Sequence, residues 1–252
     1  MHGYFREFKD ALRQAGFDAC NSEHIVLLCG DAFDRGPDAK KLLDFLLQLQ
    51  ECNRLIYVKG NHEYLMENLL KQIKNREPIS GYHWYNKTLD TLCQLTNYDP
   101  YDIALGVKDY KTISRKLSKY RKLVSKCVNY YELGDCIFVH GWIPHIRNYQ
   151  MLSKCKDWDK ASWYNGMQEW NNGWRLDDKT IVCGHWHTSF GNYYYHGEGS
   201  GEFEKDSCFE PFIDYGIIAL DGCTAFSKIV NVVKILEDGY VSITDNKDRR
   251  LK

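Results

Sequence analysis

The sequence predicts an α/β fold, and two observations indicate it. Four apolar runs have the length and composition of buried strands, and each is followed within two residues by a side chain that can bind a metal ion; they span 24–29, 54–59, 136–139 and 180–183. Helical periodicity precedes the first run and separates it from the second, giving the helix–strand alternation of an α/β fold. Ligands in such folds gather where the carboxyl ends of the strands meet, so we expect one site there.

Two amphipathic helices frame the first strand. Residues 3–17 place apolar side chains at helical spacing, and Gly16 provides a stop signal. The second helix, at 40–50, carries a leucine-rich stripe. We expect both helices to pack on the strands that they flank.

The middle of the chain has a different pattern. Residues 64–127 are rich in Lys, Asn and Tyr and show helical periodicity, which predicts a mostly helical insertion that is part lid and part outer layer. Beyond it, strands are expected at 128–133, 136–140, 180–184, 216–221, 228–236 and 239–244.

Three aromatic or glycine-rich stretches carry secondary predictions. The four tryptophans within 155–176 are interpreted as core in preference to a binding surface, and the tyrosines at 193–195 as a half-buried strand in preference to a substrate platform. The glycine-rich, charged stretch 196–207 is expected to be a loop.

Composition narrows the class of protein. A chain of 252 residues suits one domain, with or without an inserted lid. A net charge of −1 gives no electrostatic footprint of a nucleic-acid or polybasic membrane binder. The ten cysteines are scattered without a CxxC pair, so we expect a reducing cytoplasm and no disulfide scaffold. No apolar run approaches membrane-spanning length, and no signal-peptide pattern is recognisable.

Four motifs follow the four apolar runs. They read GDxxDRG at 30–36, GNHE at 60–63, HG at 140–141 and GHxH at 184–187. In this order they resemble the calcineurin-like metallophosphoesterases, and the first two resemble the phosphoprotein phosphatase branch, which also holds bacterial Ser/Thr phosphatases and diadenosine tetraphosphatases. The resemblance implies a four-layer sandwich, with two mixed sheets flanked by helices, as a single domain over 1–252 that contains 64–127 as an insertion.

The resemblance also implies a centre with two divalent metal ions. Asp31 matches the bridging carboxylate, because its two oxygens can hold two cations. The ligands of the second metal are Asn61, His140 and His185, and those of the first are His2 and, as in related enzymes with a GHxH ending, His187. Oxygen and imidazole ligands admit Mn, Fe, Zn and Co, so the identity of the metal stays open.

Three further residues receive catalytic roles from the resemblance. His62 matches the acid that protonates the leaving group, and an imidazole titrates in the range that suits this task. Asp34 matches its carboxylate partner, and Arg35 matches a phosphate clamp. The alternatives are ordinary turn chemistry for the Asp, Asn and His residues of the first two motifs and interior histidines for His140 and His185.

The chain departs from the family pattern in two places. The family begins with D-x-H at the end of a first strand, whereas this chain begins Met1-His2-Gly3. We therefore expect the first strand and its aspartate to be missing. The favoured explanation is that the sequence starts too late, and the alternative is a naturally degenerate form of the enzyme. A second phosphate-binding arginine is also absent where Ser162 stands, with Arg147 as the alternative.

The leading interpretation of function is a metal-dependent phosphoesterase that hydrolyses phosphomonoesters with a metal-activated water, in the manner of the protein phosphatases. The alternatives are a dinucleotide polyphosphate hydrolase and a degenerate, non-catalytic metal- or phosphate-binding protein. The expected partner is a phosphoprotein or a small phosphoester, without nucleic acid or membrane. The sequence leaves the oligomeric state open.

Overall fold

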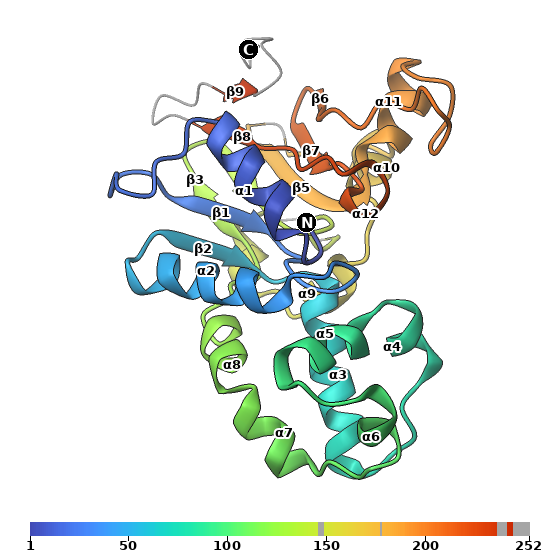
Figure 1. The fold of residues 1–252 in the computed structure, drawn as a ribbon. Coiled ribbons are helices and arrows are strands. Elements are labelled where there is room, and N and C mark those ends of the chain that lie inside the picture. The colour runs from blue at the N-terminus through green and yellow to red at the C-terminus, as the bar shows by residue number, and fades with distance from the viewer. Residues whose placement is uncertain (146–148, 177, 236–240, 244–252) are drawn as a thin grey trace.

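The computed structural model describes residues 1–145, 149–176, 178–235 and 241–243 (Figure 1). Arg147, the proposed substitute for the missing arginine, lies outside them. No helix among the described residues is long and apolar enough to cross a membrane.

Two sheets form the centre of the molecule. The first pairs two parallel strands, β1 (Val26–Cys29) and β2 (Leu55–Val58). The second has five strands in the order β3 (Tyr131–Leu133), β4 (Cys136–Phe138), β5 (Thr180–His187), β7 (Ile217–Asp221) and β6 (Phe212–Asp214). Its inner strands β4, β5 and β7 are parallel, and β3 and β6 run antiparallel at the edges. A short antiparallel pair, β8 (Val233–Ile235) and β9 (Val241–Ile243), lies apart from both.

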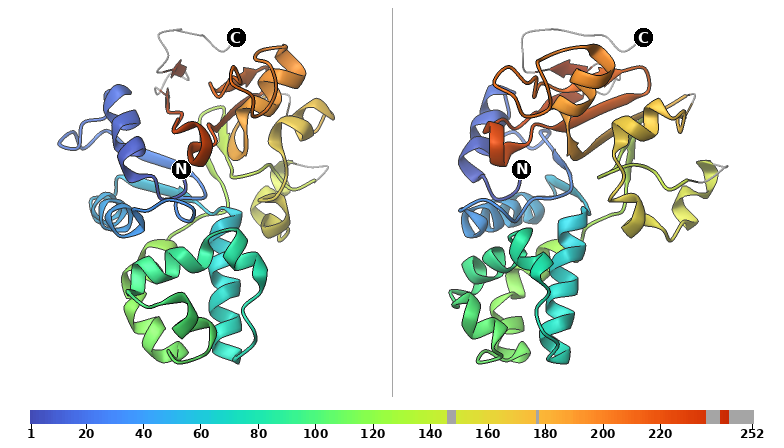
Figure 2. Two further views of the ribbon diagram at one scale, coloured as in Figure 1. Left: turned by 45° about the vertical axis from the view of Figure 1, so that its right-hand side comes forward. Right: turned by 90° about the vertical axis from the view of Figure 1, so that its right-hand side faces the viewer.

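Helices flank the sheets on both sides (Figure 2). On one side lie α1 (Phe5–Gln14) and α2 (Ala39–Glu51), and α2 contacts β2. On the other lie α9 (Trp158–Ala161), α10 (Gly166–Asn171) and α11 (Thr188–His196), where α10 and α11 contact β5 and β7. The remaining short helices are η1 (Tyr149–Lys154) and α12 (Thr224–Ser227). The predicted α/β fold with two sheets between helices is confirmed.

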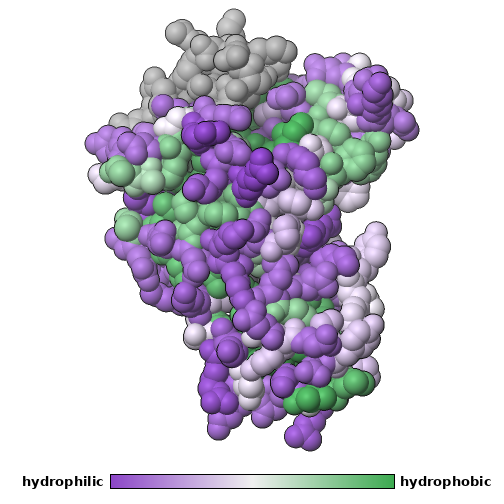
Figure 3. Space-filling model, viewed as in Figure 1, coloured by the Kyte–Doolittle hydropathy of each residue, from purple (hydrophilic) through white to green (hydrophobic). Residues whose placement is uncertain are grey.

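Residues 61–124 form a helical lobe below the sheets in Figure 1. Its helices are α3 (Asn61–Asn75), α4 (Gly81–Tyr85), α5 (Thr88–Thr96), α6 (Pro100–Ala104), α7 (Tyr110–Lys116) and α8 (Ser118–Val124). In the same view, the lobe's surface is mostly hydrophilic, apart from a hydrophobic patch near its lower end (Figure 3). The helical periodicity of 64–127 thus corresponds to real helices, whereas the status of this stretch as an insertion stays a prediction.

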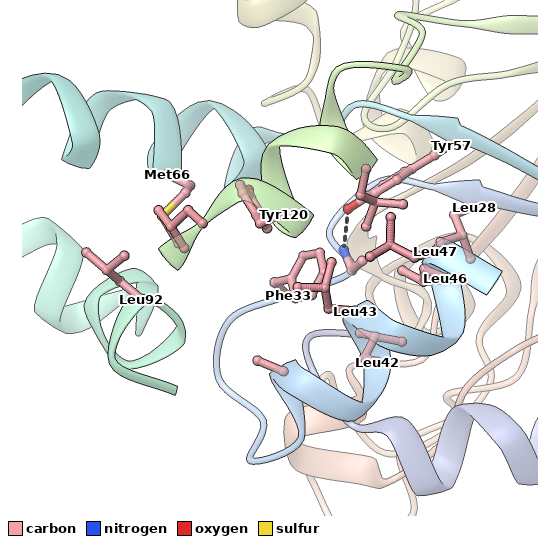
Figure 4. Close-up of a cluster of buried hydrophobic side chains, with 14 of the residues drawn as sticks. Leu28, Phe33, Leu42, Leu43, Leu46, Leu47, Tyr57, Met66, Leu92 and Tyr120 are labelled. Carbon is pink, nitrogen blue, oxygen red and sulfur yellow. Dashed lines mark hydrogen bonds between the residues drawn. The ribbon is translucent and has the colours of Figure 1, made fainter. Parts of the chain in front are cut away.

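The lobe and the sheets share one hydrophobic core. Phe33, from the turn after β1, packs against Tyr120 of α8 with ring centroids 5.3 Å apart (Figure 4). Leucines of α2 and Met66 of α3 belong to the same cluster. Each fully buried side chain of this size stabilises the fold by roughly 1.5–3 kcal/mol. The turn that carries the first motif is therefore anchored by apolar contacts to both parts of the molecule.

Some sequence expectations need correction. The tyrosines at 193–195 lie in α11 and not in a strand. Tyr195 packs against Trp170 and Phe212, whereas Tyr193 and Tyr194 are exposed, so the run follows the helical period instead of alternating. The tryptophan cluster is core only in part, because Trp158 and Trp170 are buried but Trp163 and Trp174 are exposed. Strand β6 was not expected. Of the expected strand at 228–236, residues 228–235 are described, and among these Val233–Ile235 form a strand.

Candidate metal centre

Side chains from both sheets meet at the carboxyl ends of their strands. Asp31 follows β1, Asn61 begins α3 directly after β2, His140 follows β4, and His185 lies in the last part of β5. The Asn61 Oδ1 atom is 2.8 Å from His140 Nε2 and 3.0 Å from His185 Nδ1. His140 Nε2 is 3.2 Å from Asp31 Oδ1. We call these four side chains the amide group.

The spacing of the amide group suits a divalent cation. Two ligands about 2.1 Å from one ion, at tetrahedral or octahedral angles, lie about 3.0–3.4 Å apart. The Asn61 amide can present either of its ends to this group: its nitrogen would donate to Asp31, His140 and His185, whereas its oxygen leaves four lone-pair donors facing one another. The second arrangement is a set of metal ligands, so the residues fit the cation that the motifs imply.

The two imidazoles of the amide group each turn one ring nitrogen toward the place of a cation. His140 Nδ1 lies 2.7 Å from the Cys29 carbonyl oxygen, to which it donates, so Nε2 is the nitrogen that faces Asp31 and Asn61. Burial acts to lower the pKa of His140, but the Asp31 carboxylate outweighs it and raises that pKa, so a cation that binds there would displace the proton on Nε2. Burial lowers the pKa of His185 to about 3, so that ring is neutral. A neutral imidazole is the form that ligates a cation.

A second group forms on the other oxygen of Asp31. His2 Nε2 lies 3.7 Å and His62 Nε2 3.9 Å from Asp31 Oδ2. His2 Nδ1 is 3.1 Å from the Phe33 carbonyl oxygen, which leaves its Nε2 for a metal. We call His2, Asp31 and His62 the His2 group. Among the described residues, two clusters of His and Asp side chains could hold a metal ion: the His2 group, and Asp31 with His140 and His185. One carboxylate thus faces both groups.

His62 is also paired with Asp34. Its Nδ1 lies 2.6 Å from Asp34 Oδ2, and both side chains are buried. Burial acts to lower the pKa of His62, but the carboxylates of Asp31 and Asp34 outweigh it and raise that pKa. The ring is therefore held with a proton on Nδ1 and is favoured in the doubly protonated state.

The turn that carries Asp31 and Asp34 has an unusual backbone. Asp31, Asp34 and Arg35 all have positive φ, at 49°, 71° and 60°. Such conformations are costly for side-chain-bearing residues and occur at sites where the surroundings hold them. Arg35 is exposed while its neighbours in the turn are buried, so its guanidinium is available to an incoming anion.

Two predicted positions behave differently from the rest. His187 belongs to neither group among the described residues: its Nδ1 is 2.9 Å from Ser189 Oγ and its Nε2 3.3 Å from Glu202 Oε2. The pairing of β5 with β7 shifts register between Cys183 and His187. Ser162 is buried, and its hydroxyl donates to the Asp159 carbonyl, 2.6 Å away.

A buried carboxylate that received no role from the sequence ties the two turns together. Glu63 Oε2 accepts from the backbone N–H of Gly60 at 2.8 Å and of Asp31 at 3.1 Å, and its Oε1 accepts from the Tyr57 hydroxyl at 2.6 Å. A Glu at the third position of a helix commonly accepts from the residue before the helix, so spacing alone indicated the first of these bonds. A side chain at Gly60 would overlap Asp31, which explains glycine there.

Comparison with known proteins places the chain in a family. The calcineurin-like phosphoesterase model matches residues 1–205, so the chain belongs to the calcineurin-like phosphoesterases. This family membership agrees with the resemblance drawn from the four motifs.

Individual relatives match over shorter stretches. A symmetrical bis(5′-nucleosyl)-tetraphosphatase of Proteus mirabilis is 32% identical over 78 residues, which is 31% of this chain and 27% of that protein. A zinc-dependent endopolyphosphatase of Saccharomyces cerevisiae is 25% identical over 194 residues, or 68% of this chain and 56% of that protein. A crystal structure of a proposed diadenosine tetraphosphatase superposes with a TM-score of 0.48 and 17% identity, covering 96% of this chain and 88% of that one. The chain thus spans little more than a quarter of the Proteus protein.

Proposed function

We propose that this protein is a metal-dependent phosphoesterase that hydrolyses phosphomonoesters with the help of two divalent cations. The observation that carries the proposal is the position of Asp31, which directs one oxygen to each of two groups of nitrogen and oxygen donors. A carboxylate between two cations is the arrangement of a two-metal hydrolytic site.

The residues of the site have different proposed roles. The amide group would hold one cation, and His2 with Asp31 would hold the other. His187 stays a predicted further ligand, and to bind the cation its ring would have to move away from Glu202. The cations would supply Lewis acidity at the phosphoryl oxygens and acidify water. Arg35 would grip two phosphate oxygens through its guanidinium fork.

His62 would act as the general acid. Its Nδ1–H is held by Asp34, so the proton available for transfer is the one on Nε2, which faces Asp31 at 3.9 Å. The raised pKa of His62 favours a ring that carries this proton near neutral pH. Transfer from Nε2 to the leaving-group oxygen would complete the hydrolysis.

The test is metal-dependent activity of the purified protein. We expect hydrolysis of an aryl phosphate that a chelator abolishes and that added Mn²⁺, Zn²⁺ or Fe²⁺ restores. Metal content is measured on the same samples by elemental analysis. Equal activity with and without the chelator would refute the metal mechanism, and tight metal binding with no hydrolysis of any phosphoester would favour the non-catalytic alternative.

A second candidate function is hydrolysis of dinucleotide polyphosphates. Half-exposed aromatic rings lie beside a proposed metal ligand: Trp163 is 5.9 Å and Trp186 is 6.1 Å from the His185 ring, and they are 43% and 38% exposed. Tyr82 of the lobe, 43% exposed, lies 6.2 Å from Trp163. Aromatic rings at such a place can stack on a nucleobase, at roughly 1–3 kcal/mol per base. Relatives named as bis(5′-nucleosyl)-tetraphosphatases support the same candidate.

Substrate competition separates the two candidates. Phosphopeptides and dinucleotide polyphosphates are compared for the parent protein and for Trp163→Ala, with inorganic tripolyphosphate as the substrate without a base. If the protein hydrolyses dinucleotide polyphosphates, Trp163→Ala should lower kcat/KM on the dinucleotide by roughly 5- to 150-fold. The rate on tripolyphosphate should stay that of the parent. A preference for phosphopeptides that Trp163→Ala leaves unchanged would favour the first candidate.

A further inference from the structure

One face of α5 is bonded to the turn that carries Asp34. Thr88, Thr91 and Gln94 recur every third residue and therefore share a face of the helix. The Thr91 hydroxyl accepts from the backbone N–H of Asp34 at 3.0 Å. Gln94 donates to the Gly36 carbonyl at 2.9 Å and accepts from the Ala39 N–H at 3.0 Å. The helical lobe thus holds the backbone of this turn at several points.

The bond from Thr88 differs from the others on this face because it reaches a side chain of the site and not the backbone. Its hydroxyl donates to Asp34 Oδ2 at 3.0 Å. The same oxygen receives the His62 Nδ1–H at 2.6 Å. Thr88, Asp34 and His62 are all buried, at 0%, 1% and 4% exposure, so water does not compete for these bonds.

The Thr88 hydroxyl is not engaged as a helix cap. Thr88 is the first residue of α5, and the position before it, Lys87, makes no side-chain cap. A threonine at a helix start commonly turns its oxygen toward the helix's own N–H groups. Here the hydroxyl hydrogen is directed out of the helix to a carboxylate, and the charged acceptor strengthens the bond.

We propose that Thr88 is a positioning residue for the general acid. This inference rests on the proposed function, in which His62 protonates the leaving group. A carboxylate that holds only one donor can rotate about its terminal torsion, because that torsion is broad. The second donor fixes the Asp34 carboxylate, and the fixed carboxylate orients the His62 ring. Helix α5 thereby controls a proton donor that lies in the first turn of α3.

Two substitutions at position 88 and one control test this role. Thr88→Val keeps the shape of the side chain and removes the donor, whereas Thr88→Ser keeps the donor. Thr96→Val is the matched control: Thr96 is equally buried on the same helix, but its hydroxyl donates to the Leu92 carbonyl of that helix. Rates are measured on two substrates. Phenyl phosphate has a poor leaving group that needs protonation, whereas 2,4-dinitrophenyl phosphate has a good leaving group that does not.

We expect Thr88→Val to lower kcat on phenyl phosphate roughly tenfold, a fraction of the 10²–10⁴ that a positioned general acid contributes. The rate on 2,4-dinitrophenyl phosphate and the metal content should stay near those of the parent. Thr88→Ser should restore the parent ratio of the two rates, and Thr96→Val should not change it. An equal loss on both substrates, or no loss on either, would overturn the positioning role.

A second readout does not depend on turnover. The hydrogen on His62 Nδ1 should give a downfield proton NMR signal, assigned by its absence in His62→Asn and recorded without paramagnetic metal. In Thr88→Val this signal should broaden or exchange faster, while Thr88→Ser and Thr96→Val retain it; an unchanged signal in Thr88→Val would contradict the inference. If Thr88→Val does not fold, Thr88→Ala is measured in the same two ways. A parent protein that hydrolyses no phosphoester but shows the Thr88-dependent signal would refute the proposed function and leave the Thr88–Asp34–His62 chain standing.

Discussion

The two groups that share Asp31 differ in how closely their donor atoms are held. In the amide group, Asn61 Oδ1 lies 2.8 Å from His140 Nε2 and 3.0 Å from His185 Nδ1, and Asp31 Oδ1 lies 3.2 Å from His140 Nε2. In the His2 group, the two imidazole nitrogens lie 3.7 and 3.9 Å from Asp31 Oδ2. The donor atoms of the first group are spaced like adjacent ligands of one ion, whereas those of the second group are spaced more widely.

The origin of the residues explains this difference. Asn61, His140 and His185 stand at the ends of β2, β4 and β5, so hydrogen-bonded sheets fix their backbones. His2 lies in a turn outside the sheets, with a positive φ of 54°, and His62 is already paired with Asp34. We therefore expect the ion in the amide group to bind more tightly than the ion in the His2 group.

Asp31→Asn is the change with the largest expected effect, because it alters both groups. The neutral amide removes the negative charge between two cations, and kcat/KM should fall by roughly 10⁴ or more, since even residues that only support a metal ligand are worth 10–100-fold in metal affinity or activity. Elemental analysis should show loss of both ions. Retention of one ion at full occupancy would show that one of the two groups binds its ion without this carboxylate.

His62→Asn tests whether His62 belongs to the His2 group as a ligand or acts only as the acid. As the acid it should cost roughly 10²–10⁴ in kcat on a poor leaving group, while both ions are retained. Asp34→Asn should give a milder loss of the same kind. If His62→Asn instead releases the weaker ion, the ring is a ligand and the proton donor must be sought elsewhere.

His185→Ala and His2→Ala compare the two groups directly. Each variant should lower the affinity for one ion by at least roughly 10–100-fold, since residues that merely support a ligand already contribute that much. Titration calorimetry should show which ion is affected. We expect His185→Ala to abolish the tighter binding step and His2→Ala the weaker one. Loss of the same step in both variants would mean that the two groups bind a single ion.

Arg35 provides the smallest expected effect and a control on the comparison. Arg35→Ala should lower kcat/KM roughly 10- to 100-fold, the worth of hydrogen bonds to a charged group, and should weaken inhibition by phosphate. Arg35→Lys keeps the charge without the fork and should lose less. Both variants should bind both ions as the parent does, and a change in metal stoichiometry would remove Arg35 from the role of clamp.

The part of the site that sequence predicted is the part built from strand ends. Asp31, Asn61, His140 and His185 each follow a short apolar run, and the topology of parallel strands brings such positions together. Their proximity is therefore a consequence of local patterns. Their roles as ligands remain predictions that the metal measurements test.

The supporting residues could not be predicted in the same way. Thr88 and Thr91 reach Asp34 from more than fifty positions along the chain, and threonine in a helix carries no signal for a distant carboxylate. The contact depends on how the lobe docks, which is decided by packing around Phe33 and Tyr120. His187 was assigned to the first metal from the resemblance to enzymes with a GHxH ending, and that assignment stays a prediction.

The bonds of Glu63 have a consequence for the slow motions of the centre. Its Oε2 atom is the acceptor for the amide hydrogens of both Gly60 and Asp31, which belong to turns almost thirty residues apart in sequence. An opening that exposes one of these amides to solvent must displace the acceptor of the other. The two amides should therefore exchange with deuterium as a single cooperative unit, so that one rate reports the opening of both turns.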